Sequence, residues 1–279
     1  MAEPLISNVS DTARWVAVYR AWESARPDAL FRDPLADRLA GERGRAIAAA
    51  APKQARSGWP MITRTKLIDD LIAQSLAEGC DRVVNLAAGL DTRPYRLDLP
   101  ASLTWIEADL PGMIDEKERL LAGETPRCRV TRERVDLSDA AARAAFLDRA
   151  LAGASKALVI TEGLLIYLDD EQVRALARDL ARPAARWWIL DVTSAAIVAM
   201  IQKGMGKHLD NAPMKFAPRD GVAFFEKIGW KARDIRSIYR AAVRFRRVPL
   251  VMRLFAVFPD PDPRNPGKKF WSAVVRLER

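Results

Sequence analysis

Acidic side chains follow four successive apolar segments of the sequence, at positions that a parallel sheet would bring to one edge. These acids are Asp91, Asp109, Asp136 and Glu162. A carboxylate at a strand end can accept hydrogen bonds from a ribose diol or pair with a cationic ligand. Each acid taken alone also suits the start of a helix, where free N–H groups need acceptors. Their repetition on successive segments favours one shared binding site.

A turn of small residues, Ala87-Ala-Gly89, follows the first of these segments. Small residues let the backbone approach a ligand closely, and the N–H groups of a following helix can meet an anion. The same residues would also form a tight turn from strand to helix with no ligand. The Gly-x-Gly-x-x-Gly spacing that accommodates a pyrophosphate is absent, which argues against a nicotinamide-dependent oxidoreductase.

The segments that must position these residues alternate between strand and helix patterns. Predicted strands cover residues 82–86, 103–108, 129–135, 157–161, 186–192, 231–235 and 270–277. Predicted helices cover residues 10–22, a short stretch from 33, 61–78, 110–122, 138–151, 170–181 and 218–228. This alternation predicts an α/β fold, a doubly wound and mostly parallel sheet of seven strands with helices on both faces. Ligands bind such sheets at the carboxyl ends of the strands.

The chain lacks repeats and low-complexity tracts, so a single domain is expected over residues 1–279. Within it, residues 1–58 are expected to form a helical lid and residues 59–192 a ligand-binding core. An insertion after the fifth strand, within residues 193–230, is expected to cap a second substrate. The last strands lie in residues 231–279.

Composition excludes several classes of protein. The first ten residues lack a basic flank followed by an apolar run, and the longest apolar stretch, 192–201, is half of a membrane span, so we expect a cytoplasmic protein with no membrane partner. Two cysteines, without metal-ligand spacing, are too few for a disulfide scaffold. The single histidine, His208, leaves no histidine-rich metal site.

The positive charge of the chain is concentrated at one end. The formal net charge is +9, but residues 201–279 hold 18 Lys or Arg and 7 Asp or Glu, a net charge of +11. Basic clusters can neutralise nucleic-acid phosphates, and this motivates an alternative function as a nucleic-acid-binding protein or RNA methyltransferase. No aromatic stacking motif or zinc site accompanies them. A solvated basic face, or attraction of an acidic substrate, therefore remains the preferred interpretation.

Four stretches of the sequence carry a resemblance to a known family. They are Asn85-Leu-Ala-Ala-Gly-Leu-Asp-Thr-Arg-Pro-Tyr-Arg, Trp105-Ile-Glu-Ala-Asp-Leu-Pro, Ile160-Thr-Glu-Gly-Leu-Leu-Ile-Tyr-Leu, and the N-terminal run from Ser10-Asp-Thr-Ala through Ala21-Trp-Glu-Ser to Phe31-Arg-Asp-Pro. Together they resemble the leucine carboxyl methyltransferase family and its bacterial relatives. The resemblance covers residues 7–192 and implies a Rossmann-like class I methyltransferase fold. It also implies S-adenosylmethionine as cofactor, S-adenosylhomocysteine as product, and methyl transfer to oxygen.

The resemblance assigns one group of residues to the methionine end of this cofactor. Arg64 would hold the methionine carboxylate, and Glu162 would face the ammonium group. Gly89 would bring the backbone close to the cofactor, and Asp91 would support the turn. Ala87 stands where many methyltransferases carry a glycine, so it is a departure from the pattern within the same cofactor loop.

A second group is assigned to the nucleoside end. Asp109 resembles the ribose-binding acid, with Glu107 as the alternative. Asp136 and Leu137 resemble the adenine contacts, although Asp136 could also cap the helix that begins near Ser138.

Three residues are candidates for contact with the methyl acceptor: Arg20 on the first helix, Tyr167 beyond the fourth strand, and His208 in the insertion. A carboxylate acceptor needs no general base, whereas a phenol or alcohol does. The shortage of histidine therefore favours a small carboxylic acid as acceptor. Methylation of a phenol or alcohol in metabolite tailoring is the alternative.

Overall fold

A seven-stranded sheet forms the centre of the computed structural model, which describes residues 6, 9–52, 55–205 and 212–279. The strands are β1 (Arg82–Leu86), β2 (Thr104–Asp109), β3 (Arg129–Arg134), β4 (Ala157–Thr161), β5 (Ala185–Thr193), β6 (Lys231–Ser237) and β7 (Ser272–Glu278). Their order across the sheet is β3-β2-β1-β4-β5-β7-β6. β7 runs antiparallel to both of its neighbours, β5 and β6, and the other paired strands are parallel. The predicted fold class, a mostly parallel seven-stranded sheet, is confirmed.

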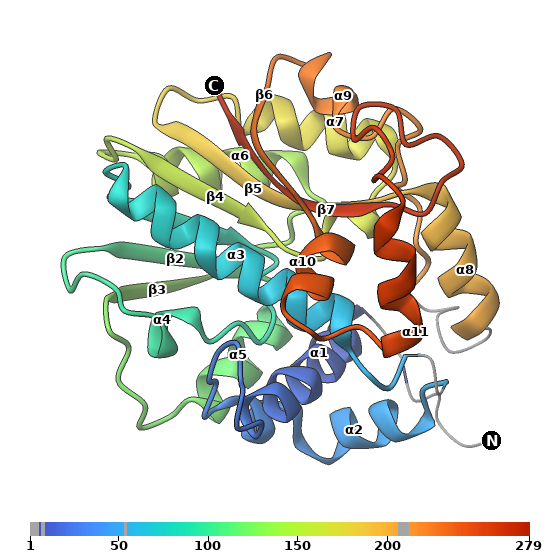
Figure 1. Ribbon diagram of the computed structural model, residues 1–279. Helices are drawn as coiled ribbons and strands as arrows, with labels where there is room; N and C mark the ends of the chain where they lie inside the picture. The colour runs from blue at the N-terminus through green and yellow to red at the C-terminus, as the bar shows by residue number, and fades with distance from the viewer. Residues whose placement is uncertain (1–5, 7–8, 53–54, 206–211) are drawn as a thin grey trace, which may run out of the picture.

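The helices lie before, between and after the strands. They are α1 (Val9–Ser24), α2 (Ala36–Ala50), α3 (Trp59–Ala77), α4 (Arg93–Arg96), α5 (Pro111–Leu120), α6 (Ala140–Leu151), η1 (Leu165–Tyr167), α7 (Asp170–Asp179), α8 (Ala195–Met205), α9 (Ala223–Glu226), α10 (Ile238–Arg244), α11 (Leu250–Arg253) and η3 (Leu254–Val257). Figure 1 shows α3 crossing one face of the sheet and α6 and α7 behind it.

Each face of the sheet buries its own apolar cluster. On one face α3 and α10 pack against alternate strand residues such as Val83 and Leu158. On the other face α6, α7 and α9 pack around Val84, Val159 and Trp188. Neighbouring residues of one strand thus serve opposite faces, as the two-residue period of a strand requires. A separate cluster joins α1, α2 and α5 beside the sheet.

Several stretches differ from the prediction made from sequence, since α4, η1, α8, α11 and η3 were not predicted and α2 is longer than the short helix expected from residue 33. Only α9 is helical within the helix predicted over 218–228, because Gly221 takes a positive φ of 52° and the next amide donates to the carbonyl of Pro263 at 2.9 Å. The helix α10 was not predicted. It begins where the Ser237 side chain accepts a hydrogen bond from the amide of Arg240, which is an N-cap contact.

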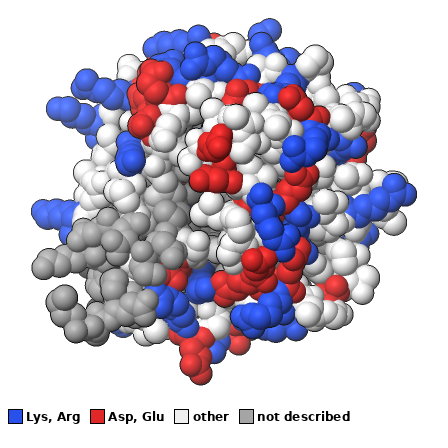
Figure 2. Space-filling model, turned by 180° about the vertical axis from the view of Figure 1, so that it is seen from behind, with Lys and Arg blue, Asp and Glu red and all other residues white. Residues whose placement is uncertain are grey.

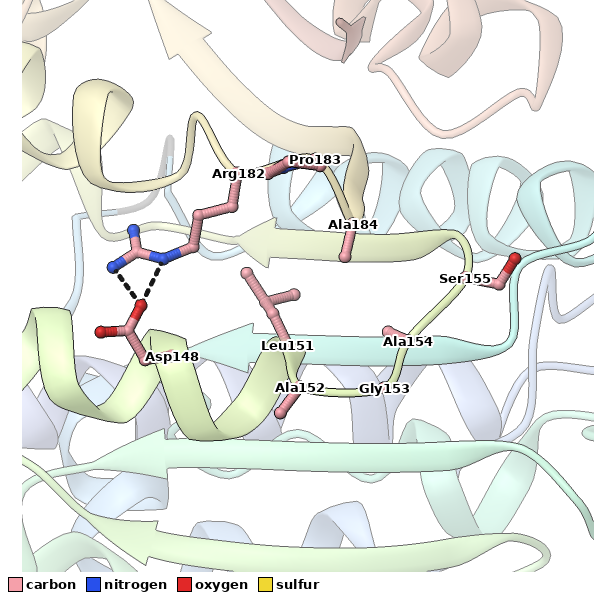
Figure 3. Close-up of a pocket in the computed structure, with 9 residues that line it drawn as sticks. All are labelled: Asp148, Leu151, Ala152, Gly153, Ala154, Ser155, Arg182, Pro183 and Ala184. Carbon is pink, nitrogen blue, oxygen red and sulfur yellow. Dashed lines mark hydrogen bonds and ion pairs between the residues drawn. The ribbon is translucent and has the colours of Figure 1, made fainter.

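One hollow of the described surface lies at the amino ends of β4 and β5. It is lined by residues 151–155, which lead into β4, and 182–184, which lead into β5 (Figure 3). Arg182 spans it to Asp148 at 2.9 Å. Because parallel sheets bind ligands at the carboxyl ends of their strands, this hollow is not the candidate site.

Much of the C-terminal positive charge is used in ion pairs within the fold. Arg276 on β7 contacts Asp234 at 2.8 Å and Glu78 at 2.9 Å, and Arg240 contacts Asp260 at 2.8 Å. Figure 2 shows acidic and basic side chains lying close together over much of the face seen from behind. Among the described residues, no helix is long and apolar enough to cross a membrane.

We predict that Trp188 is a main support of the core. Its ring is fully buried against Phe225 and Trp230, and its Nε1–H donates to Thr161 Oγ1 at 2.8 Å. Replacing Trp188 with Ala is expected to lower the free energy of unfolding by about 3–5 kcal/mol, because it leaves a large cavity. The half-exposed Trp22 provides the control, since W22A should cost less than about 1 kcal/mol. Equal losses in denaturant titrations of the two variants would contradict this account of the core.

Candidate functional site

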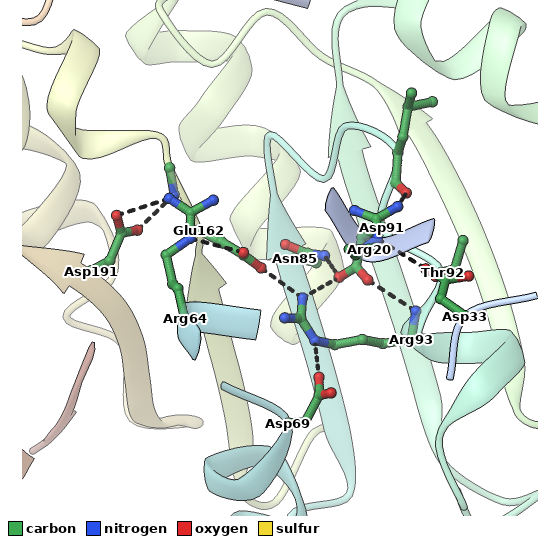
Figure 4. Close-up of polar contacts among 12 residues, drawn as sticks. Arg20, Asp33, Arg64, Asp69, Asn85, Asp91, Thr92, Arg93, Glu162 and Asp191 are labelled. Carbon is green, nitrogen blue, oxygen red and sulfur yellow. Dashed lines mark hydrogen bonds and ion pairs between the residues drawn. The ribbon is translucent and has the colours of Figure 1, made fainter. Parts of the chain in front are cut away.

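Charged side chains meet at the carboxyl ends of four strands, and those at the ends of β1, β4 and β5 belong to a connected chain of ion pairs (Figure 4). Asp91 follows β1, Asp109 ends β2, Glu162 follows β4, and Asp191 lies near the end of β5. Arg64 reaches this edge from α3. The structure therefore brings together most of the residues that the sequence assigned to one site.

Arg64 is buried and lies between two carboxylates. Its Nε donates to Glu162 Oε1 at 3.0 Å, and its Nη1 donates to Asp191 Oδ2 at 3.2 Å. The other oxygen of Asp191 accepts the amide of Gly163 at 2.7 Å. Gly163 has a φ of 66°, and a Cβ there would lie 3.4 Å from the Arg64 guanidinium. The left-handed backbone of this turn, which side chains with a Cβ rarely adopt, explains why a glycine follows Glu162.

Arg93, the first residue of α4, belongs to the same set of ion pairs. It contacts Asp69 at 2.7 Å, Asp91 at 2.7 Å and the second oxygen of Glu162 at 2.8 Å. Asn85 on β1 also donates to Asp91, at 2.9 Å. Glu162 thus divides its two oxygens between Arg64 and Arg93, which fixes the plane of its carboxylate.

The arginines hold the carboxylates in their charged forms. Burial raises the pKa of Glu162, but the charges of Arg93 and Arg64 outweigh burial and leave this pKa below its ordinary value. The same balance applies to Asp91, where burial is opposed by Arg93, Lys117 and Arg96, and the pKa lies well below its usual range.

The small-residue turn after β1 has the backbone that its composition predicts. Ala87 has a φ of 51° and Gly89 a φ of 46°, both in the left-handed region. At Ala87 this conformation costs roughly 1–2 kcal/mol, because a Cβ is disfavoured there, so a glycine at this position would relieve strain. The amide of Gly89 donates to Asp109 Oδ2 at 2.7 Å, which ties the turn to the end of β2.

Asp109, and not Glu107, is the acid available to a ligand at the end of β2. Glu107 is fully buried and pairs with Lys117 and Arg132, each at 2.9 Å. Asp109 is half-buried, and each of its oxygens accepts one main-chain hydrogen bond, from Gly89 or from Leu110. Each oxygen therefore keeps one further acceptor position. Burial raises the pKa of Asp109 despite these bonds.

The two predicted adenine contacts lie beside Asp109 but have local contacts of their own. Val135, which precedes them, donates its amide to the Asp109 carbonyl at 2.8 Å. Asp136 is exposed and accepts from the amide and hydroxyl of Ser138, and these bonds lower its pKa. Leu137 offers its carbonyl to Arg143 at 2.7 Å. The alternative role of Asp136 as a helix cap is wrong, because α6 begins at Ala140 and the Asp139 side chain accepts from the amides of Ala141 and Ala142. A contact of Asp136 with adenine stays a prediction.

The three acceptor-side candidates are not brought together within the described residues. Tyr167 is half-buried in an apolar cluster with Ile6 and Ile47, and its hydroxyl lies 3.5 Å from Thr12 Oγ1. Burial raises its pKa, so the phenol is neutral near pH 7. Arg20 donates to Asp33 at 2.9 Å and to the Leu90 carbonyl at 2.6 Å, which anchors α1 to the turn after β1. His208 lies outside the described residues.

Sequence reasoning did not identify Asp69, Arg93 and Asp191 as members of this site. Asp191 carried a detectable signal, since it is an acid within an otherwise apolar strand segment. The partnership of Asp69 with Arg93 depends on how α3 lies across the sheet, and no local pattern indicates it.

We predict that the Glu162 pairing contributes stability in a pH-dependent way. Its folded pKa is lowered, so the contribution is complete above the ordinary pKa of Glu and is lost as the pH falls through the lowered value. Glu162→Gln should therefore lower the free energy of unfolding by about 2 kcal/mol at neutral pH. The difference from the unsubstituted protein should shrink on acidification. The exposed Glu42→Gln serves as control, and a difference for Glu162→Gln that is constant with pH would contradict the assignment.

The described architecture matches solved methyltransferase structures. A putative methyltransferase from Thermobifida fusca superposes with a TM-score of 0.58 at 14% identity, over 99% of this chain and 96% of that one. Magnesium protoporphyrin IX methyltransferase from Synechocystis, solved with bound SAH, superposes with a TM-score of 0.50 at 14% identity, over 95% and 99% of the two chains. At such low identity these similarities support the fold.

Sequence comparison identifies the family. A protein of Mycolicibacterium smegmatis described as a putative S-adenosyl-L-methionine-dependent methyltransferase is 39% identical over 253 residues, 81% of this chain and 85% of that protein. A Frankia alni protein of the same description is 32% identical over 254 residues, 85% and 87% of the two chains. The model of the leucine carboxyl methyltransferase family matches residues 13–181. Both relatives are described as dependent on S-adenosyl-L-methionine. This chain therefore belongs to the leucine carboxyl methyltransferase family.

Proposed function

We propose that this chain is an S-adenosylmethionine-dependent methyltransferase that forms a methyl ester on a small carboxylic acid. The observation that supports this proposal most strongly is the set of charged groups at the strand ends. Arg64 and Glu162 offer one positive and one negative group side by side, and Asp109 offers free acceptor positions on the neighbouring strand. S-adenosylmethionine carries complementary groups and supplies an activated methyl on a positively charged sulfur.

The methionine end of the cofactor fits the Arg64–Glu162 pair. An amino acid is a zwitterion, so its carboxylate suits Arg64 and its ammonium suits Glu162. The lowered pKa of Glu162 keeps this group ionised at neutral pH. Asp191 and Arg93 would hold the two side chains in place when they turn from each other towards a ligand.

The ribose end fits Asp109. A ribose diol donates two hydrogen bonds, and the aspartate has an acceptor position left on each oxygen. The left-handed backbone at Ala87 and Gly89 keeps the turn small, so a ligand can lie close to the main chain. Asp136 and Leu137 on the next strand end would border the adenine.

The acceptor side favours a carboxylate. Tyr167 is neutral near pH 7 at the ordinary pKa of a phenol, and burial raises its pKa further, so its hydroxyl can donate a hydrogen bond to an anionic oxygen but is a poor base. A carboxylate arrives as a ready nucleophile, so the protein needs only to position it and exclude water. We assign positioning to Tyr167 and to the lid of residues 1–58, which Arg20 holds to the cofactor turn. His208 remains a candidate for the same side.

We predict that Asp109 determines cofactor affinity. Asp109→Asn removes the negative charge that strengthens two hydrogen bonds to the ribose, so the Kd for S-adenosylmethionine should rise about 10- to 100-fold in calorimetric titration. Asp115→Asn, an exposed change on α5, is the matched control and should leave the Kd unchanged. Melting temperatures of both variants separate a loss of binding from a loss of folding. An unchanged Kd for Asp109→Asn would contradict the assignment of the ribose to this residue.

We predict that the labelled methyl group is transferred to a carboxylate. With methyl-labelled S-adenosylmethionine and a panel of small aliphatic and aromatic acids and phenols, the product should release labelled methanol in mild alkali, because carboxyl esters hydrolyse readily. Label that resists alkali would replace the carboxylate with a phenol or alcohol as acceptor.

Tyr167→Phe should lower kcat/KM roughly tenfold through loss of one hydrogen bond. The control is Tyr239→Phe, because the Tyr239 hydroxyl contacts the Met252 carbonyl.

A further inference from the structure

Six large apolar side chains are exposed on one continuous segment after α10. We call this segment, residues 250–258, the apolar ledge. It comprises α11, η3 and Phe258. Its exposed side chains, which range in exposed fraction from 60% to 79%, are Leu250, Val251, Leu254, Phe255, Val257 and Phe258. Exposed apolar groups of this size and continuity are characteristic of interaction surfaces.

The apolar ledge is held against the fold by its main chain, so its side chains are left facing outward. Arg240 on α10 donates to the carbonyls of Ala256 and Phe258 and pairs with Asp260. The Tyr239 hydroxyl donates to the Met252 carbonyl. These bonds give main-chain carbonyls of the ledge hydrogen-bond partners within the protein. The carbonyls therefore stay paired when a bound surface removes water from them. The main chain of the ledge is therefore held in place by hydrogen bonds from α10.

The ledge and the residues just before it carry basic side chains and no acidic ones. Residues 244–258 contain four arginines and no Asp or Glu. Arg247 is used internally, since it pairs with the buried Glu23 at 2.8 Å. Within the described chain, Arg244, Arg246 and Arg253 form no ion pair, and Arg253 instead donates to the Arg246 carbonyl at 3.2 Å. The ledge thus combines apolar side chains with available cations.

The location of the ledge relates it to the candidate site. Both β5 and β6 run antiparallel to β7, so the carboxyl end of β6 lies at the same edge of the sheet as that of β5. The chain leaves β6 at this edge and enters α10 directly. Arg247, just after α10, also ties the segment to the end of α1 through Glu23. A surface bound to the ledge would therefore face the edge of the sheet that carries the site.

We propose that the apolar ledge docks this protein on an anionic lipid bilayer surface. Apolar side chains that enter the boundary of the headgroups, together with cations that meet acidic headgroups, are the two contributions that peripheral membrane binding requires. A second copy of this chain fits less well, because a two-fold contact would place the arginines of both copies against each other. This proposal departs from the expectation, made from composition, of no membrane partner, and it needs no spanning helix.

Co-sedimentation with vesicles tests the proposal. The full-length protein should sediment with vesicles of phosphatidylcholine and phosphatidylglycerol, less with phosphatidylcholine alone, and less at high salt. Arg244→Gln/Arg246→Asn should lower the partition coefficient roughly thirtyfold, a factor of about five per cation. The asparagine suits the positive φ of 57° at Arg246. Leu254→Ser/Phe255→Ser should also lower it, with melting temperatures unchanged because both side chains are exposed.

Arg119→Gln/Arg178→Gln removes the same charge from exposed positions on α5 and α7 and is the matched control, which should bind as the unsubstituted protein does. The proposal is overturned by the absence of binding to anionic vesicles, or by equal binding of the ledge variants and the control. It is also overturned if light scattering shows a dimer that the Leu254→Ser/Phe255→Ser variant dissociates while vesicles bind neither protein, since a second copy would then cover the ledge.

Discussion

Glu162 shares its carboxylate between Arg64 and Arg93, and the geometry of the candidate site depends on this shared ion pair. Through Arg93 it connects to Asp69 on α3 and Asp91 after β1, and through Arg64 to Asp191 on β5. The ends of three strands, β1, β4 and β5, and the long helix α3 are thus joined by ion pairs. Removing one member of such a buried set leaves another charge without compensation, which makes each member costly to lose.

The same arrangement explains why the site suits a zwitterionic ligand. Buried charges cost free energy unless they are paired, and here the pairing is internal. A ligand that carries both an ammonium and a carboxylate can take the place of the Arg64–Glu162 contact without leaving either side chain unpaired. An uncharged ligand of equal size could not make this exchange. Asp109 adds acceptor positions at a fixed place because the Gly89 amide holds it.

The sequence predicted the sheet well because its signals are local. Strands such as 82–86 and 157–161 are short apolar runs bounded by breaks, and the structure has β1 and β4 at those same residues. The same pattern predicted that acids such as Asp91, Asp109 and Glu162 lie at the ends of strands. The ion pairs between α3 and the sheet, such as Asp69 with Arg93, join residues far apart in sequence, so only the packing of the helix reveals them. The resemblance already preferred Asp109 to Glu107, but only the structure shows the physical reason, which is that Lys117 and Arg132 pair with Glu107.

The central claim is that these charged groups bind S-adenosylmethionine, and a crystal structure with S-adenosylhomocysteine tests it most directly. We predict that the ribose hydroxyls lie within hydrogen-bond distance of Asp109 and that the amino-acid end lies between Arg64 and Glu162, with their direct contact opened. A ligand bound away from the carboxyl ends of the strands, or an Arg64–Glu162 pair left closed beside a bound ligand, would contradict the account.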